Sequence, residues 1–188
     1  ASAFGDGKSA LLYPTSAANT SVEMFEARVP ALVLRKELLV DSGGAGKFRG
    51  GLGQVISARK LREDANPCQI GIFPNGIHSE VEGLFGGKSG GYSRGIVHRE
   101  KGVEHDVGTG ELSELQDANE VAELYIAGGS GYGDPLMRNY KNLQNDIIQG
   151  YISQKCARDI YGCVVKKDGI IDIEASDALR KSMRNTMA

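Results

Sequence analysis

The sequence predicts an α+β fold in which a glycine-rich, mainly antiparallel β module is followed by C-terminal helices. Up to about residue 135, short apolar runs of strand length alternate with glycine clusters and polar turns. Beyond that point glycine becomes sparse and apolar residues take helical spacing. We therefore expect a glycine-rich module over residues 1–135 and a helical segment with a small hairpin over residues 136–188, packed on the first.

Composition excludes several classes of protein. A formal charge of −2 gives no electrostatic attraction for nucleic acid or for an anionic membrane, and only 6% of the residues are aromatic. No apolar run approaches the roughly 20 residues that a membrane-spanning helix needs. The three cysteines are odd in number, widely spaced and without a CxxC pair, as expected for reduced thiols. These features predict a cytoplasmic protein without nucleic-acid or membrane partners.

The most unusual stretch is residues 41–53, DSGGAGKFRGGLG, in which six of thirteen residues are glycine. Apolar runs at 31–40 and 54–61 flank it, so we expect two strands joined by a long polar loop. The loop carries Asp41, Ser42, Lys47 and Arg49. Glycine runs persist where backbone takes a positive φ or approaches another group closely. This loop is therefore the first candidate for a site.

None of the glycine clusters forms a nucleotide-binding motif. A P-loop needs glycine six residues before the lysine and Ser or Thr after it. Lys47 has Asp41 and Phe48 at these positions. The Gly-Lys-Ser sequences at 7–9 and 87–89 have Ser2 and Glu82 in place of the first glycine. The closest approach to GxGxxG, which starts at Gly44, ends on Arg49.

Two more glycine clusters follow, at residues 83–95 and 128–135. Leu84 and Phe85 are expected to anchor the first of them on the core. We expect strands at 68–73 and 121–127, and polar irregular chain at 107–119. His78, Glu80 and Glu82 have a spacing of two, which would place them on one face of a strand. They match no metal signature, so we predict surface charge and no metal site.

Helix signals occur at both ends of the chain. Thr20 and Glu23 have the spacing of a capping box, which predicts a short helix that ends before Pro30. Helices are expected at 139–149, with Gly150 after it, and at 153–160, begun by Ser153. A hairpin of strands at 163–165 and 170–173 should follow. The final helix is expected over 176–187, capped by Ser176 or Asp177, with Arg180, Lys181 and Arg184 suiting its dipole.

The ordered motifs resemble a known family. NTSVEMFEARVP, DSGGAGKFRGGLGQ, EGLFGGKSG and GGSGYGDPLMR, followed by helices that end in IYGCVV, resemble the C-terminal part of the hydantoinase B family. That family includes N-methylhydantoinase B subunits, the matching half of 5-oxoprolinase, and subunits of acetone and acetophenone carboxylases. The resemblance runs from about residue 19 to residue 165, which is roughly the last third of a B-type subunit.

The resemblance implies a role in a two-subunit, ATP-dependent enzyme. In such enzymes an A-type ATPase subunit phosphorylates the carbonyl oxygen of the substrate, and a B-type subunit completes the reaction. The implied partners are the remaining N-terminal part of the B-type subunit and the A-type ATPase subunit. The implied cofactors are ATP and a divalent metal. Both are expected to bind outside this chain, since the family's metal motif has no match here.

The residues that match family motif positions are candidates for a pocket or a subunit contact, and none receives a catalytic step. These candidates are Asn19, Glu23, Asp41, Ser42 and Arg49. The matching glycines are expected to shape the loops: Gly43, Gly44, Gly46, Gly50, Gly51, Gly86, Gly87, Gly129, Gly131 and Gly133.

Three functions stay open on the sequence. The first is a subunit or fragment of an ATP-dependent cyclic-amide hydrolase acting on hydantoin- or 5-oxoproline-type rings. The second is a component of an ATP-dependent ketone carboxylase. The third is a non-catalytic structural or assembly module, which is the expected state of the isolated chain. We favour cyclic-amide hydrolysis for the complete complex and expect the chain alone to be inactive.

Overall fold

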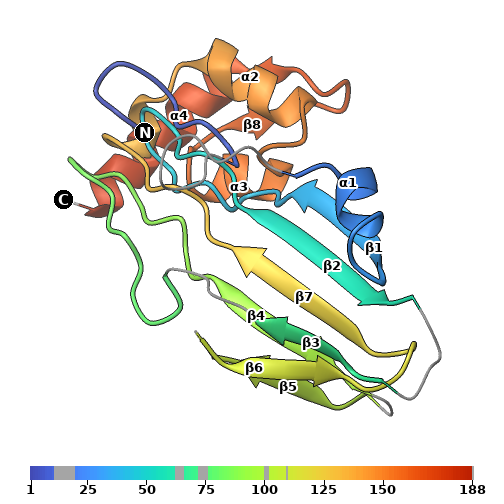
Figure 1. The fold of residues 1–188 in the computed structure, drawn as a ribbon. Helices are drawn as coiled ribbons and strands as arrows, with labels where there is room; N and C mark the ends of the chain where they lie inside the picture. Colours follow the sequence, from blue (N-terminus) through green and yellow to red (C-terminus); the bar gives the residue numbers. More distant parts are fainter. Residues whose placement is uncertain (11–19, 62–65, 72–75, 100–101, 109, 188) are drawn as a thin grey trace.

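The computed structural model describes residues 1–10, 20–61, 66–71, 76–99, 102–108 and 110–187 (Figure 1). Its largest element is a five-stranded sheet with strand order β1-β2-β7-β4-β5, in which every neighbouring pair is antiparallel. The strands are β1 (Ala31–Leu38), β2 (Gln54–Lys60), β7 (Val121–Ile126), β4 (Arg94–His98) and β5 (Glu104–Val107). The α+β class with a mainly antiparallel sheet is confirmed.

One face of this sheet is covered by a second, two-stranded sheet. Strands β3 (Cys68–Gly71) and β6 (Leu112–Leu115) pair antiparallel and lie beside β4 and β5 (Figure 1). Because side chains alternate along a strand, the apolar residues of one parity meet between the two sheets. Val97, Val107 and Leu115 form the buried centre of this core, and Ala122 and Leu124 pack against it.

The C-terminal part builds a second core. It contains η2 (Pro135–Met137), α2 (Tyr140–Ile148), α3 (Gln154–Asp159), the hairpin β8 (Val164–Val165) and β9 (Ile171–Asp172), and α4 (Ile173–Met187). Leu143, Tyr161 and Cys163 are buried together there, and Ala45 of the first glycine loop joins the same cluster. The helical part therefore packs directly on the glycine loops at one end of the large sheet (Figure 1).

Several local predictions are confirmed. Asn139 caps α2 by accepting from the Lys141 N–H, and Gly150 follows with a φ of 70°. Ser153 caps α3 through the Cys156 N–H. These helix ends could be predicted from the sequence, because a capping side chain and a left-handed glycine are local requirements of a helix terminus. Within the described residues, no helix is long and apolar enough to cross a membrane.

Three predictions of local structure are wrong. The short helix α1 (Val22–Glu26) is capped by Ser21, which accepts from Met24, and not by Thr20. No strand forms over residues 78–82. Strand β6 lies within the segment predicted to be irregular. It is short and half polar, so its pairing with β3 decides its conformation. Of the predicted strand at 68–73, residues 72 and 73 lie outside the described residues, and β3 ends at Gly71.

The final helix also differs from its prediction. It begins at Ile173, where Asp172 accepts from the Ala175 N–H, so Ser176 lies inside the helix and is buried. Ser176 instead accepts from Val164 N–H and joins α4 to β8. Arg180 is buried and bonded rather than a cation that only suits the dipole. The predicted start of this helix, with Ser176 or Asp177 as its cap, is thus wrong and lies about one turn too far along the chain.

Candidate functional site

The glycine clusters come together as one structure. We call the segments 6–9, 42–53, 83–91 and 127–133 the glycine platform. Their backbones lie against each other and are joined by hydrogen bonds between segments that are far apart in sequence. The main bonds run from Gly44 N to Gly129 O (2.9 Å), Gly129 N to Gly51 O (2.8 Å), Gly131 N to Lys88 O (2.8 Å), Lys88 N to Ala45 O (2.7 Å) and Gly7 N to Arg49 O (2.7 Å).

Close backbone approach explains most of the glycines. A Cβ at Gly50 would lie 1.8 Å from the carbonyl oxygen of Gly129, and one at Gly44 would lie 2.2 Å from that of Lys88. Among the glycines predicted to shape the loops, only Gly86 and Gly133 have a left-handed φ. The others in that set whose Cβ would come within 3 Å of neighbouring backbone are Gly43, Gly46, Gly51, Gly87 and Gly131; Gly129 is looser, at 3.3 Å.

The platform does not fit a phosphate group. A phosphate-binding loop needs backbone N–H groups that point to the ligand. Of the ten glycines predicted to shape the loops, six donate their N–H to carbonyl oxygens of the same chain: Gly44, Gly50, Gly87, Gly129, Gly131 and Gly133. Over the residues that the structure describes, no group of three His, Cys, Asp or Glu side chains could hold a metal ion. These six N–H groups are thus not free for a phosphate, and the described residues contain no such group of metal ligands.

Asp41, Ser42 and Arg49 are all engaged inside the chain. Asp41 lies in the left-handed region with a φ of 62°, and its carboxylate accepts from the Ser153 N–H at 2.7 Å. The Ser42 hydroxyl donates to Leu39 O and accepts from the Gly53 N–H, which closes the loop between β1 and β2. Asp41 therefore joins the first glycine loop to the start of α3, and Ser42 holds that loop in shape.

Glu23 and Asn19 are not part of this group. Glu23 is exposed in the first turn of α1, and no described contact brings it to the platform. Asn19 lies outside the described residues. The Asp41 carboxylate has one chemical effect that the structure shows. Burial first, and the nearby charge of Asp41 second, raise the pKa of the Cys156 thiol to about 12, so this thiol stays protonated at neutral pH.

A buried network of arginine and aspartate was not predicted from the sequence. Arg138 is 1% exposed, and its guanidinium donates to Asp146 from Nε (3.0 Å) and Nη2 (2.5 Å). It also forms a two-bond pair with Asp6, at 2.7 and 2.8 Å. On the other side of Asp146, the Nε of buried Arg49 lies 3.4 Å from Oδ1. The four charges balance and connect the N-terminal segment, the first glycine loop and α2.

Each guanidinium also holds backbone. Arg138 donates to Lys47 O at 3.2 Å, and Arg49 donates to Gly50 O at 2.6 Å. Arg49 lies over the Tyr151 ring at 5.4 Å. Arg180, whose guanidinium stacks on Tyr140 at 4.1 Å, donates to Tyr161 O and Arg138 O. A signal for the network exists in the sequence, since Asp146 is a carboxylate three residues after Leu143 on the apolar stripe of α2.

The network sets the ionisation of Asp6. Burial would raise the pKa of this carboxyl, but the hydrogen bond and charge of Arg138 outweigh burial and leave the pKa below its ordinary value. For Arg138, burial would lower the pKa, and the bond to Asp6 with the charge of Asp146 raises it instead. Both residues are therefore charged at neutral pH.

A pH dependence follows for Asp6. Because its pKa is lower in the folded state, its carboxylate stabilises the fold above the unfolded-state pKa of about 3.9, and this contribution is lost as the pH falls below that value. We expect Asp6→Asn to reduce the loss of stability that the chain shows between about pH 6 and pH 3. Urea unfolding across this range tests it, and an identical pH dependence in the variant would contradict it.

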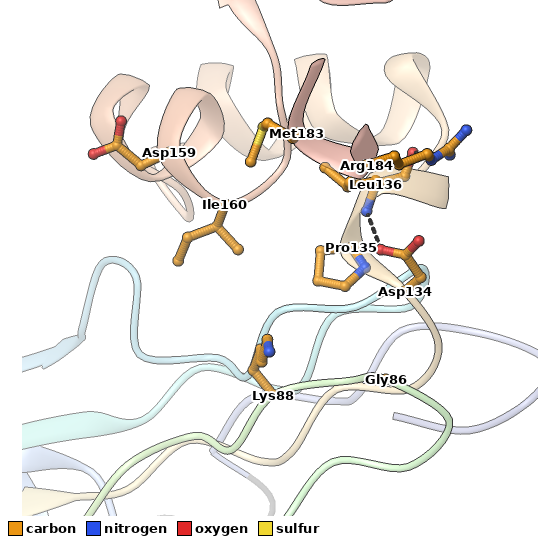
Figure 2. A pocket seen from close by; sticks show the side chains of 9 residues that line it. All are labelled: Gly86, Lys88, Asp134, Pro135, Leu136, Asp159, Ile160, Met183 and Arg184. Atoms are coloured by element: carbon orange, nitrogen blue, oxygen red, sulfur yellow. Dashed lines mark hydrogen bonds between the residues drawn. The ribbon is translucent and has the colours of Figure 1, made fainter. Parts of the chain in front are cut away.

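A hollow of ≈ 640 Å³ lies between the platform and the helices (Figure 2). Figure 2 shows Lys88 reaching into it from the platform side, with Ile160 and Met183 opposite. Asp134 lies at its edge and accepts from the Leu136 N–H at 2.8 Å. Its lining residues are Gly86, Lys88, Asp134, Pro135, Leu136, Asp159, Ile160, Met183 and Arg184. The hollow combines an apolar floor with charged groups at its rim.

Comparison with known proteins places this arrangement in a family. A family model described as Hydantoinase B/oxoprolinase matches residues 1–135, which is more than half of the chain. This protein belongs to the hydantoinase B/oxoprolinase family. The match covers the sheet and the whole glycine platform.

Among its relatives, the beta subunit of a caprolactamase from Pseudomonas jessenii is 32% identical over 163 residues. An uncharacterized protein, MJ0963, from Methanocaldococcus jannaschii is 32% identical over 165 residues. The matches cover 85% and 86% of this chain but only 27% and 28% of those proteins. This chain therefore spans little more than a quarter of the length of these relatives.

Two solved structures share the fold. A nucleotide-free acetone carboxylase structure matches with a TM-score of 0.81 and 24% identity, over 100% of this chain and 29% of that chain. The ATP-dependent caprolactamase from Pseudomonas jessenii matches with a TM-score of 0.67 and 27% identity, over 94% of this chain and 32% of that chain. The first likeness concerns the fold alone.

Proposed function

We propose that this chain is part of a B-type subunit of an ATP-dependent cyclic-amide hydrolase. Family membership supports the B-type assignment, and the caprolactamase relative supports a cyclic amide as substrate. Hydrolysis of such an amide needs activation, because resonance makes the uncatalysed barrier high. In this proposal a partner ATPase subunit supplies that activation, and ATP and a divalent metal bind outside the described residues.

The observation that carries the proposal is the glycine platform. Many of its N–H groups bond to backbone within the platform and its backbones are in direct contact, so it is suited to be a rigid surface rather than a moving loop. Asp41, Ser42 and Arg49 hold the platform through hydrogen bonds to backbone and are proposed to shape a pocket or a subunit contact through it. Preorganised surroundings of this kind let an enzyme orient a substrate at little entropic cost.

We also propose that residues 1–135 form one module on which residues 136–188 are packed. Ala45 of the first loop joins the C-terminal core, and Arg138 pairs with Asp6 across 132 positions of the chain. The two parts are thus proposed to form one rigid surface of the reaction site. The isolated chain is proposed to lack activity by itself.

A ketone carboxylase is the second candidate. It is favoured by one observation, the 27% identity over 179 residues with the acetone carboxylase alpha subunit of Xanthobacter autotrophicus. In that reaction the activated substrate is an enol phosphate, and it is carboxylated with bicarbonate instead of being attacked by water. The rigid surface proposed here could serve either reaction, so the two must be distinguished by turnover.

The experiment uses the complete assembly, which is this chain together with the rest of a B-type subunit and an A-type ATPase subunit. Release of ADP is measured with caprolactam, hydantoin or 5-oxoproline, and in parallel with acetone or acetophenone plus bicarbonate. We expect lactam-dependent ATP hydrolysis with a ring-opened product, and none with the 188-residue chain alone. Ketone consumption that requires bicarbonate, without any lactam turnover, would establish the carboxylase instead. Catalytic turnover by the isolated chain would contradict the proposal that it supplies only a rigid surface of the site.

A further inference from the structure

The turn over residues 84–87 presents an aromatic side chain to solvent on strained backbone. Phe85 has a φ of 55° and Gly86 a φ of 91°. Leu84 O accepts from the N–H groups of Gly87 (3.1 Å) and Gly133 (2.8 Å), so the turn is held on the platform. A non-glycine residue in the left-handed region is uncommon and costly, and such strain concentrates at functional contacts.

Burial within the chain does not explain this strain. Phe85 is 77% exposed and Leu84 is 61% exposed, so the predicted anchoring of this loop on the core by these two residues is wrong. Among the described residues, the Phe85 ring packs against one aromatic side chain, that of Tyr132, and their ring centroids are 5.1 Å apart. Val81, just before the turn, is 71% exposed. We call these three apolar residues, Val81, Leu84 and Phe85, the Phe85 surface.

The hollow shown in Figure 2 adjoins this surface, because Gly86 of the turn and Lys88 after it line the hollow. Its floor is apolar, made of Pro135, Leu136, Ile160 and Met183. A rigid apolar projection beside an apolar hollow is the pattern of a protein contact, in which an anchor side chain fills a pocket next to a hot spot.

We infer that the Phe85 surface and the adjoining hollow form the contact with the rest of the B-type subunit. This inference rests on the proposed function. The relatives supply the reason for this occupant, since nearly three quarters of their length lies outside the region that this chain matches. At the rim, Asp134 is used in capping and Arg184 donates to Leu136 O, whereas Lys88 reaches into the hollow, so the occupant brings apolar side chains with a carboxylate beside Lys88.

The test measures side-chain oxidation by hydroxyl radicals, read residue by residue by mass spectrometry, in the isolated chain and in the complete B-type subunit. We expect Leu84 and Phe85 to be oxidised at least about fivefold more slowly in the complete subunit, as fully covered interface residues are. Val103 and Ile170 serve as controls, because they are comparably exposed and lie in other turns. Their oxidation should remain unchanged.

Equal oxidation of Phe85 in the two samples would overturn the inference, whether or not the complex turns over a lactam. Protection that is already present in the isolated chain, and that disappears on dilution, would show that a second copy covers the surface, and would also overturn it. This readout does not depend on activity, so a failure here is separate from a failure of the proposed function.

A variant gives a second measurement. With the chain and the rest of the subunit supplied as two polypeptides, Phe85→Asp should weaken their association by at least about 30-fold, the loss typical of a hot-spot aromatic. Ile170→Asp is the matched control and should leave the affinity unchanged. Equal affinity for the Phe85→Asp variant and the parent chain would contradict the inference.

Discussion

Replacing Arg138 by methionine is expected to lower the free energy of unfolding by about 3–5 kcal/mol, the cost of leaving a buried charge without its partner. Methionine fills similar volume, so loss of packing contributes little. Asp146 would keep only the 3.4 Å approach of Arg49, whose Nε makes no hydrogen bond in the described structure. Asp6 would lose both bonds from Arg138 and keep the bond from the Arg49 N–H. Urea unfolding of the purified chain measures this change.

Arg94→Met is the matched control. Arg94 pairs with Asp106 at 2.6 Å, a short distance, but both side chains are more than half exposed. Exposed ion pairs contribute roughly 0–1 kcal/mol, so this variant should unfold almost like the parent chain. A loss of similar size in the two variants would show that pairing inside the network does not carry the stability assigned to it.

The second large effect is expected from Gly50→Ala. Its Cβ would lie 1.8 Å from Gly129 O and 2.5 Å from Gly129 C, and both contacts are with backbone. No side chain can rotate away, so the platform segments must separate. We expect a loss of at least about 3 kcal/mol in the free energy of unfolding, the upper end of what overpacking costs.

Gly5→Ala is the control for the same chemical change. Gly5 has no heavy atom within 4 Å of its Cβ position and no left-handed φ. This variant should stay within about 0.5 kcal/mol of the parent, as surface substitutions do. In the complete complex, Gly50→Ala should also abolish the proposed lactam-dependent ATP hydrolysis, whereas Gly5→Ala should leave it intact. A stable and active Gly50→Ala variant would remove the basis for a rigid surface.

The sequence predicted local features well where the requirement was local. The end of α2 followed from Gly150 and the start of α3 from Ser153, because a cap is satisfied within a few residues of the chain. Strand β6 and the start of α4 were missed, because pairing with β3 and capping by Asp172 compete with weak intrinsic preferences. Phe85 was assigned to the core on its hydrophobicity, yet its turn is held with the side chain outward.

The sequence alone determined the class of fold, the family resemblance and the positions at which the backbone requires glycine. Only the tertiary structure decided which segments meet at those places. A glycine indicates that space is needed beside the backbone, but it does not indicate which segment of the chain will occupy that space. The same holds for the charges. Arg49 was identified as a motif residue. Its partner Asp146, however, lies far from it in the sequence, and Asp6 lies far from Arg138. Burial selects such pairs, since charges removed from water must find one another wherever the fold brings them together.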